Sequence, residues 1–88
     1  MTLAIIVPVL NEGAALVERL QALQPLRARG AQLLVVDGGS TDASVAVAVP
    51  LADQVLAAPR GRAAQMNAGA CATRADTLLF LHADTQLP

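Results

Sequence analysis

The stretch Leu3–Val9, LAIIVPV, is a continuous run of aliphatic residues interrupted only by Pro8. A strand that is apolar at every position is buried on both faces, as in a parallel sheet covered by helices on each side. Proline lacks an amide donor and is tolerated near the end of such a strand, where pairing stops. The run therefore predicts a central strand that ends just before Asn11 and Glu12.

The alternation of a strand with a helix continues along the chain. Apolar residues at helical spacing, from Leu16 to Leu23, predict a helix that is broken by Pro25 and then Gly30. We predict further strands at Gln32–Asp37, 53–57 and 77–81, and further helices at 42–49 and 62–73. Valines alternate in 42–49 as they would in a strand, but the alanine content and a cap at Ser40 or Thr41 favour a helix. In 62–73 the small residues Ala63, Ala64, Ala70 and Cys71 are expected to allow close approach to the sheet.

This order of elements predicts the fold class. Strands joined by helical crossovers are connected right-handedly and pair in parallel. We therefore expect an α/β fold, an open, mostly parallel Rossmann-like sheet with helices on both faces. Because ligands bind beyond the carboxyl ends of the strands in such sheets, polar residues at those ends are the candidate site.

The composition bounds the size and the kind of partner. With 88 residues, 55% of them hydrophobic, the chain can form one core and one domain. Its six basic residues, all arginines, and seven acids give a net charge of -1, which provides no electrostatic footprint for nucleic acid or an anionic membrane. We expect a small-molecule partner.

The single cysteine and the apolar runs indicate a cytoplasmic protein. Cys71 cannot form an intramolecular disulfide, and its neighbours Ala70 and Ala72 suggest a packed helix face in a reducing compartment. The apolar runs are all interrupted by proline or charged residues, well short of the ~18 apolar residues of a membrane-spanning helix. We expect no transmembrane segment.

Two polar clusters follow the first two strands. Asn11 and Glu12 could accept hydrogen bonds from a ribose or a base, or could equally begin a helix. Asp37 leaves its strand into Gly38 and Gly39, where an acceptor could face a nucleobase N–H. The residues that follow, 40–42, are interpreted as turn and capping residues.

The start of the third helix is a candidate phosphate site. Arg60, Gly61 and Arg62 lie where free backbone N–H groups and the positive end of the helix dipole favour anions, although two solvated surface arginines are the alternative. Asn67 and Gly69 each disfavour a helix, which indicates a packing or ligand role, or a helix end near Gly69.

His82 and Asp84 follow the last strand with one residue between them, so both side chains lean the same way in extended geometry. A divalent metal could lie between them and a diphosphate. Oxygen ligands suit Mg²⁺ or Mn²⁺, and the imidazole favours Mn²⁺.

Together these clusters resemble the donor-binding half of inverting family 2 glycosyltransferases with the GT-A fold. The similar segments run in the family's order over nearly the whole chain: IIVPVLNE, VVDGGSTD, GRAAQMNAG and LLFLHADTQLP. The RGRAAQMNAG and LHADT segments resemble a bacterial subgroup with an unassigned substrate.

The resemblance implies roles for single residues. The loop from Pro8 through Asn11 to Glu12 would cradle the nucleoside, with Glu12 near the ribose. Asp37 would read the base, and Arg62 would lie near the donor phosphates. Asn67 belongs to the matching AAxxNAG segment and is taken as a further substrate-binding candidate.

The last cluster has the metal role. Asp84 matches the last acid of the family's Asp-x-Asp motif and would hold the Mn²⁺ or Mg²⁺ that bridges the diphosphate. His82 stands where the motif's first acid is usual, so the resemblance leaves the ribose contact and the metal preference open at this position. The metal would stabilise the leaving nucleoside diphosphate as a Lewis acid.

The resemblance also implies what the chain lacks. The family's catalytic base lies in a second half that would begin after Pro88, so we expect residues 1–88 to be a truncated nucleotide-sugar-binding half that has no catalytic residue and is inactive alone. The apolar fourth strand would expose an edge or face and promote self-association. A non-catalytic Rossmann-like nucleotide-binding or assembly module is the alternative, although no G-x-G-x-x-G follows the first strand.

Overall fold

The computed structural model describes residues 2–81. Its strands are β1 (Leu3–Val9), β2 (Gln32–Asp37), β3 (Gln54–Ala57) and β4 (Thr77–Phe80). Its helices are α1 (Gly13–Ala22), α2 (Gln24–Ala28), α3 (Ser44–Ala48) and α4 (Arg62–Cys71), with a short 3-10 turn η1 (Val49–Leu51) after α3. The strands and helices alternate as the sequence predicts.

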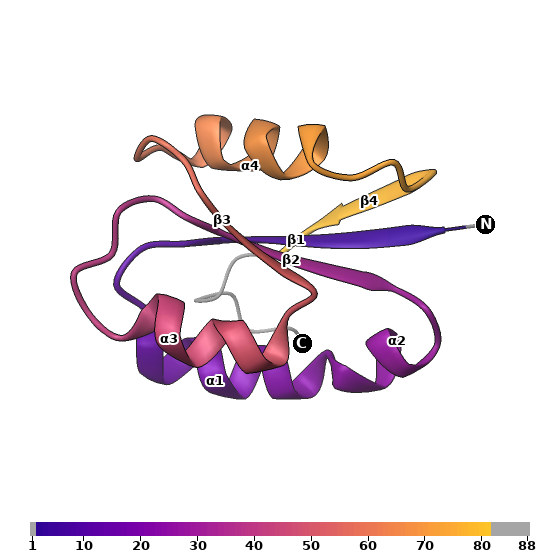
Figure 1. Ribbon diagram of the computed structural model, residues 1–88, viewed down its shortest axis with the longest axis horizontal. Helices are drawn as coiled ribbons and strands as arrows, with labels where there is room; N and C mark the ends of the chain where they lie inside the picture. Colours follow the sequence, from indigo (N-terminus) through magenta and orange to yellow (C-terminus); the bar gives the residue numbers. More distant parts are fainter. Residues whose placement is uncertain (1, 82–88) are drawn as a thin grey trace.

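The four strands form one sheet in the order β3-β2-β1-β4, and every pair is parallel. The register pairs Val9 with Asp37 and Asp37 with Ala57, so the carboxyl ends of β1, β2 and β3 lie level with one another. Helix α4 covers one face of the sheet, and α1, α2 and α3 cover the other (Figure 1). The predicted open parallel α/β sheet with helices on both faces is confirmed.

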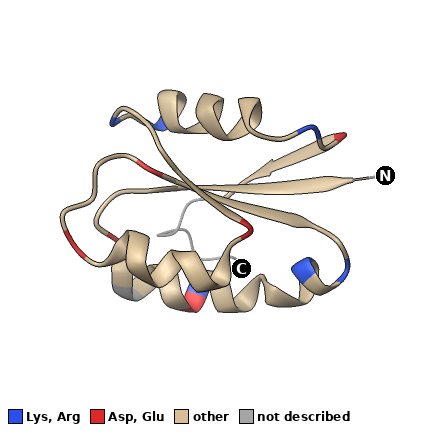
Figure 2. Ribbon diagram, in the orientation of Figure 1, with Lys and Arg blue, Asp and Glu red and all other residues tan. Residues whose placement is uncertain are grey.

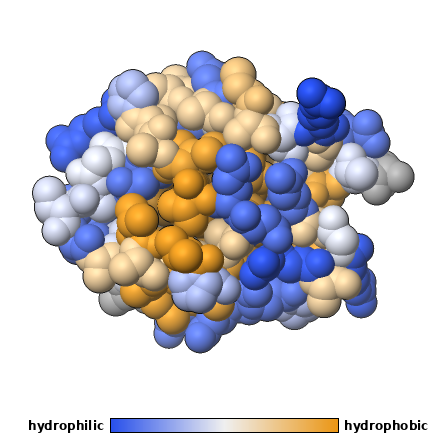
Figure 3. All heavy atoms as spheres, viewed as in Figure 1, coloured by the Kyte–Doolittle hydropathy of each residue, from blue (hydrophilic) through white to orange (hydrophobic). Residues whose placement is uncertain are grey.

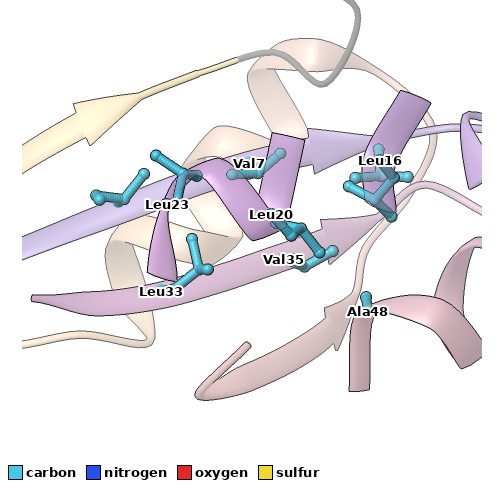
Figure 4. Close-up of a cluster of buried hydrophobic side chains, with 9 residues drawn as sticks. Val7, Leu16, Leu20, Leu23, Leu33, Val35 and Ala48 are labelled. Carbon is cyan, nitrogen blue, oxygen red and sulfur yellow. The ribbon is translucent and has the colours of Figure 1, made fainter. Parts of the chain in front are cut away.

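Alternate residues of the central strands supply two cores. Ile5, Val7 and Val9 of β1 face the layer of α1 and α3, where Leu16 and Leu20 pack between helix and sheet. Figure 4 shows Leu20 and Leu23 close to Val7, Leu33 and Val35 of the strands. Burying one such side chain contributes roughly 1.5–3 kcal/mol. This layer is therefore the main source of stability.

The opposite core is built from smaller groups. Ala4, Ile6, Leu34 and Val36 are completely buried under α4. At Gly69 a Cβ atom would lie only 2.5 Å from Cγ2 of Ile6, closer than real contacts allow. The glycine in this helix thus has a packing role, and α4 continues past it to Cys71.

The prediction of which small residues of α4 face the sheet is partly wrong. Ala63 and Cys71 are exposed, whereas Ala68, Ala70 and Ala72 pack against the core. Gly69 lies on the side of α4 that faces the sheet. Cys71, two positions further along the helix, therefore points away from the sheet.

Four element boundaries also differ from the prediction. Pro25 does not end the helical region, because it lies in the first turn of α2, where a missing amide donor costs nothing. The chain leaves α2 at Gly30, whose φ of 100° favours glycine. The helix predicted at 42–49 exists but is shorter, and α4 and β4 each end before their predicted limits, at Cys71 and Phe80.

Strand β4 lies at an edge of the described sheet, and all of its residues are exposed. Leu78, Leu79 and Phe80 have 37%, 41% and 39% of their surface accessible. Apolar atoms also gather at the opposite edge, over β3 and α3 (Figure 3). Among residues 2–81 no helix has the length and apolar character to cross a membrane.

Candidate functional site

Three loops meet at the carboxyl end of the sheet. They follow β1, β2 and β3, and backbone hydrogen bonds join them: the amide of Gly38 donates to the carbonyl of Val9 (2.9 Å), and the amide of Ala58 donates to that of Asp37 (2.9 Å). Figure 2 shows basic residues at the start of α4 and acidic residues in the β2–α3 connection, at the same end of the molecule.

A pocket of about 210 Å³ opens at this rim between β1 and the start of α4. Its lining residues come from the end of β1, the loop after it, and the first turn of α4: Pro8, Val9, Leu10, Glu12, Arg60, Gly61, Arg62 and Gln65. The structure therefore brings together three of the predicted site residues, Pro8, Glu12 and Arg62, although Pro8 and Arg62 are separated by 54 positions in the sequence.

The first turn of α4 gives the pocket a positive wall. Gly61 precedes the helix with φ 135° and ψ 132°, which favours glycine, and as the N-cap residue it has no side chain to cap the amides of the first turn. Acidic residues are absent from this turn, while Arg60 and Arg62 flank the glycine. Unpaired amide groups and the helix dipole make such a turn a binding place for anions. The pocket is suited to a phosphate-containing ligand.

Asp37 lies beside the pocket and is used by its own loop. Only 6% of its surface is accessible. Oδ2 accepts hydrogen bonds from the amides of Gly39 (3.0 Å) and Ser40 (2.9 Å), and Oδ1 accepts one from the Ser40 hydroxyl. A carboxylate oxygen accepts about two hydrogen bonds, so Oδ1 retains room for one further donor.

Asn11 joins the first loop to the second. Its φ of 52° is in the left-handed region, which asparagine tolerates better than most residues. The amide of Asn11 donates to Oγ of Ser40 (2.9 Å), and its Oδ1 accepts the amide of Thr41 (2.8 Å). The Ser40 and Thr41 side chains therefore do not cap α3 as predicted, because they contact the β1–α1 loop instead.

Asp42 bonds to the first residues of two helices without being the N-cap residue of either. Its carboxylate accepts hydrogen bonds from the amides of Ser44 (2.9 Å) and Gly13 (3.3 Å), which lie at the starts of α3 and α1. The Ser44 hydroxyl, followed by the Ser44 amide, holds the pKa of Asp42 below its usual value. Ser44 Oγ in turn accepts the amide of Glu12 (3.1 Å). The predicted turn role of Asp42 thus extends to both helix starts.

Gln65 was missed by the sequence reasoning. The residue is 4% accessible and lines the pocket. Nε2 donates to the carbonyls of Val9 (3.0 Å) and Val36 (2.9 Å), and Oε1 accepts the amide of Gly61 (3.3 Å). The available signal was helical spacing, since Gln65 stands four residues before Gly69 on the face that packs on the sheet.

The remaining candidates do not line the pocket. Asn67 is exposed in the middle of α4. His82 and Asp84 lie outside the described residues. Within residues 2–81 no group of three histidine, cysteine or acidic side chains is arranged to hold a metal ion.

Solved structures of other proteins share the fold of this chain. Crystal structures of glucosyl-3-phosphoglycerate synthase from Mycobacterium tuberculosis have the same fold; one is 25% identical with a TM-score of 0.87, covering 99% of this chain and 36% of that chain. The complex with Mn²⁺, UDP and glucosyl-3-phosphoglycerate is 24% identical with a TM-score of 0.83, covering 99% and 35%. The complex with Mg²⁺ and UDP is 24% identical with a TM-score of 0.83, covering 94% and 33%.

This chain spans about a third of the length of these solved structures. No curated protein matches its sequence at a significant level. The sequence profile described as glycosyl transferase family 2 matches residues 4–88, which is nearly the whole chain. The fold is that of the GT-A neighbours, and the chain belongs to glycosyl transferase family 2.

Proposed function

We propose that the pocket at the carboxyl end of the sheet binds the diphosphate of a nucleoside-diphosphate sugar. The observation that carries the proposal is the uncapped first turn of α4, which presents Arg60, Gly61 and Arg62 to a pocket of about 210 Å³. A diphosphate needs several N–H donors and positive charge in one place, and the described wall supplies both.

The nucleoside would lie along the β1–α1 loop. Pro8 and Glu12 line the pocket next to the arginines, so a ribose joined to the diphosphate would reach Glu12. Asp37 ends the neighbouring strand, and the remaining acceptor position of its Oδ1 suits a nucleobase N–H. Asn11 would act by shaping this loop, and Asn67 would contact ligand only at the outer surface of α4.

A divalent metal, Mn²⁺ or Mg²⁺, is proposed as the cofactor. The mycobacterial synthase was crystallised with UDP and either ion. The described pocket residues fit the diphosphate rather than a metal, because arginines and a helix amino terminus repel a cation. The metal ligand is proposed to be Asp84, with His82 beside it. A bound metal would supply Lewis-acid stabilisation of the leaving diphosphate.

The proposed reaction of the whole enzyme is inverting transfer of a sugar to an acceptor. A chain that spans a third of its structural neighbours would contribute the donor site, and the catalytic base is proposed to belong to the part of the fold that this chain does not cover. On this proposal residues 1–88 bind the donor and do not turn it over alone. The cytoplasmic location belongs to the same proposal.

Isothermal titration of the chain with UDP and with GDP, in the presence of Mn²⁺, tests the donor site. We expect saturable binding of one of them, and a loss of about tenfold or more in Arg62→Ala, because a hydrogen bond between charged groups contributes about 1.5–3 kcal/mol. Arg74→Ala is the matched control, since Arg74 is exposed beyond the far end of α4. A wild-type chain that binds neither nucleotide would favour the non-catalytic assembly module.

A further inference from the structure

We infer that Gln65 is a positioning residue that holds the phosphate-binding turn of α4 against the ends of β1 and β2. This inference rests on the proposed donor site and assigns to it a residue whose side-chain hydrogen bonds go to backbone groups of the protein. The relevant observation is one buried carboxamide that connects three separate segments of backbone.

The hydrogen bonds of Gln65 fix the orientation of its side chain. The two carbonyls of Val9 and Val36 can only accept, so the amide nitrogen must face them. The oxygen then faces the amide of Gly61, which can only donate. Flipping the carboxamide would bring acceptor against acceptor and donor against donor. Because the side chain is 4% accessible, water does not compensate for a lost partner there.

Gly38 provides the space that this arrangement needs. A Cβ atom at position 38 would lie 2.8 Å from Oε1 and 2.9 Å from Cδ of Gln65. Gly38 is not in the left-handed region that requires glycine, unlike Gly39, whose φ is 101°. The glycine at 38 is therefore explained by the carboxamide and not by the turn. Gly38 and Gln65 form a complementary pair.

The consequence is a defined distance between the two parts of the donor site. Val9 and Val36 belong to the strand ends next to the proposed nucleoside side, and Gly61 lies between the two arginines of the phosphate side. The carboxamide spans the gap between them. Its loss would let the first turn of α4 move away from the strands, so the diphosphate would lose hydrogen bonds while the nucleoside contacts remain.

The experiment compares the affinities for UDP and GDP with those for uridine and guanosine, in the full chain with Mn²⁺. Gln65→Met keeps the volume and removes the hydrogen bonds. We expect the affinity for the bound diphosphate to fall about tenfold, the loss of one charge-assisted hydrogen bond, and the affinity for its nucleoside to change less than about twofold. Cys71→Ala, on the exposed side of the same helix, is the control.

A second pair of variants protects the test against misfolding. Gly38→Ala displaces the carboxamide without removing it and should give the same selective loss. In a Gln65→Ala background, Gly38→Ala should cost nothing further, because the group that it would strike is gone. Equal losses for the nucleotide and the nucleoside, or an unchanged diphosphate affinity in a folded Gln65 variant, would overturn the inference. A wild-type chain that binds no nucleoside diphosphate would instead overturn the donor site itself.

Discussion

On the face covered by α1 and α3, leucine side chains fill the space between helices and sheet, whereas on the face covered by α4 the helix backbone itself comes close to the strands. Leu16, Leu20 and Leu23 belong to the first layer, and Gly69 with its neighbouring alanines belongs to the second. The first layer buries more apolar volume. The second places the start of α4, with its arginines, at a set distance from the strand ends. The α1–α3 face of the sheet thus contributes mainly to stability, and the α4 face mainly to the proposed ligand binding.

The largest expected effect is on the leucine layer. Leu20→Ala removes a completely buried side chain between α1 and the sheet, and such truncations cost about 2–5 kcal/mol of unfolding free energy. Urea denaturation measures it. Val45→Ala, at an exposed site on α3, is the control and should change stability by less than about 0.5 kcal/mol. Per folded molecule, the affinity for a nucleoside diphosphate should stay unchanged in Leu20→Ala; a parallel loss of affinity would break the division between the faces.

Gly69→Ala should affect both stability and binding. Alanine is the better helix former by about 1 kcal/mol, but its methyl group would strike Ile6, and overpacking costs about 1–3 kcal/mol. We expect net destabilisation and a weaker affinity for a nucleoside diphosphate, since α4 must move outwards. Titration calorimetry and thermal melting measure the two effects. A stabilised protein with full affinity would show that the approach of α4 is not tight.

Acid should loosen the two faces unequally. The Ser44 hydrogen bonds lower the pKa of Asp42; at Asp53 partial burial raises the pKa, but the Leu33 amide and Arg27 outweigh it and hold the pKa below its ordinary value. Both carboxylates serve the α1–α3 side, where Asp53 pairs with Arg27 at 3.0 Å. Gln65, which holds α4, does not titrate.

A lowered pKa in the folded state means that the unfolded state binds protons first as the pH falls. The contribution of these two carboxylates is therefore complete above the ordinary value of 3.8 and is lost as the pH falls through their lower folded values. Hydrogen exchange at decreasing pH should show α2 and α3 opening before α4. In Asp53→Asn the acid-dependent part at α2 should shrink. Simultaneous opening of both faces would contradict this order.

The smallest change in stability is expected for substitutions in β4, whose residues are all exposed. An edge strand with exposed Leu78, Leu79 and Phe80 can pair with a second copy of the chain, because its unpaired backbone groups match those of another strand. Leu79→Lys should lower the average mass in sedimentation equilibrium and change unfolding by less than about 0.5 kcal/mol. A monomeric wild-type chain would contradict self-association through this edge.

The sequence predicted the order and type of the elements because continuous apolar strands and helical spacing are local patterns. It predicted that Glu12, Asp37, Arg62 and Asp84 share one rim, since parallel strands carry their following loops to the same end. Glu12 and Arg62 line the pocket there, Asp37 is not among its lining residues, and Asp84 lies outside the described residues.

The sequence did not predict the roles of Gln65 and Gly38, because these depend on a contact between two residues that are separated by 27 positions in the sequence. The prediction that Cys71 packs against the sheet was wrong for a similar reason. Small residues lie on several sides of α4, so only tertiary packing decides which side faces the sheet.

Asn11 couples the connections that follow β1 and β2. Its amide donates to Ser40 and its side-chain oxygen accepts from Thr41, although its φ of 52° is unfavourable for most residues. The two connections are therefore joined to each other by hydrogen bonds. A ligand that presses on either connection must move both, so the free energy of any opening motion is shared between them. Grafting a new specificity into one connection would require redesign of the other.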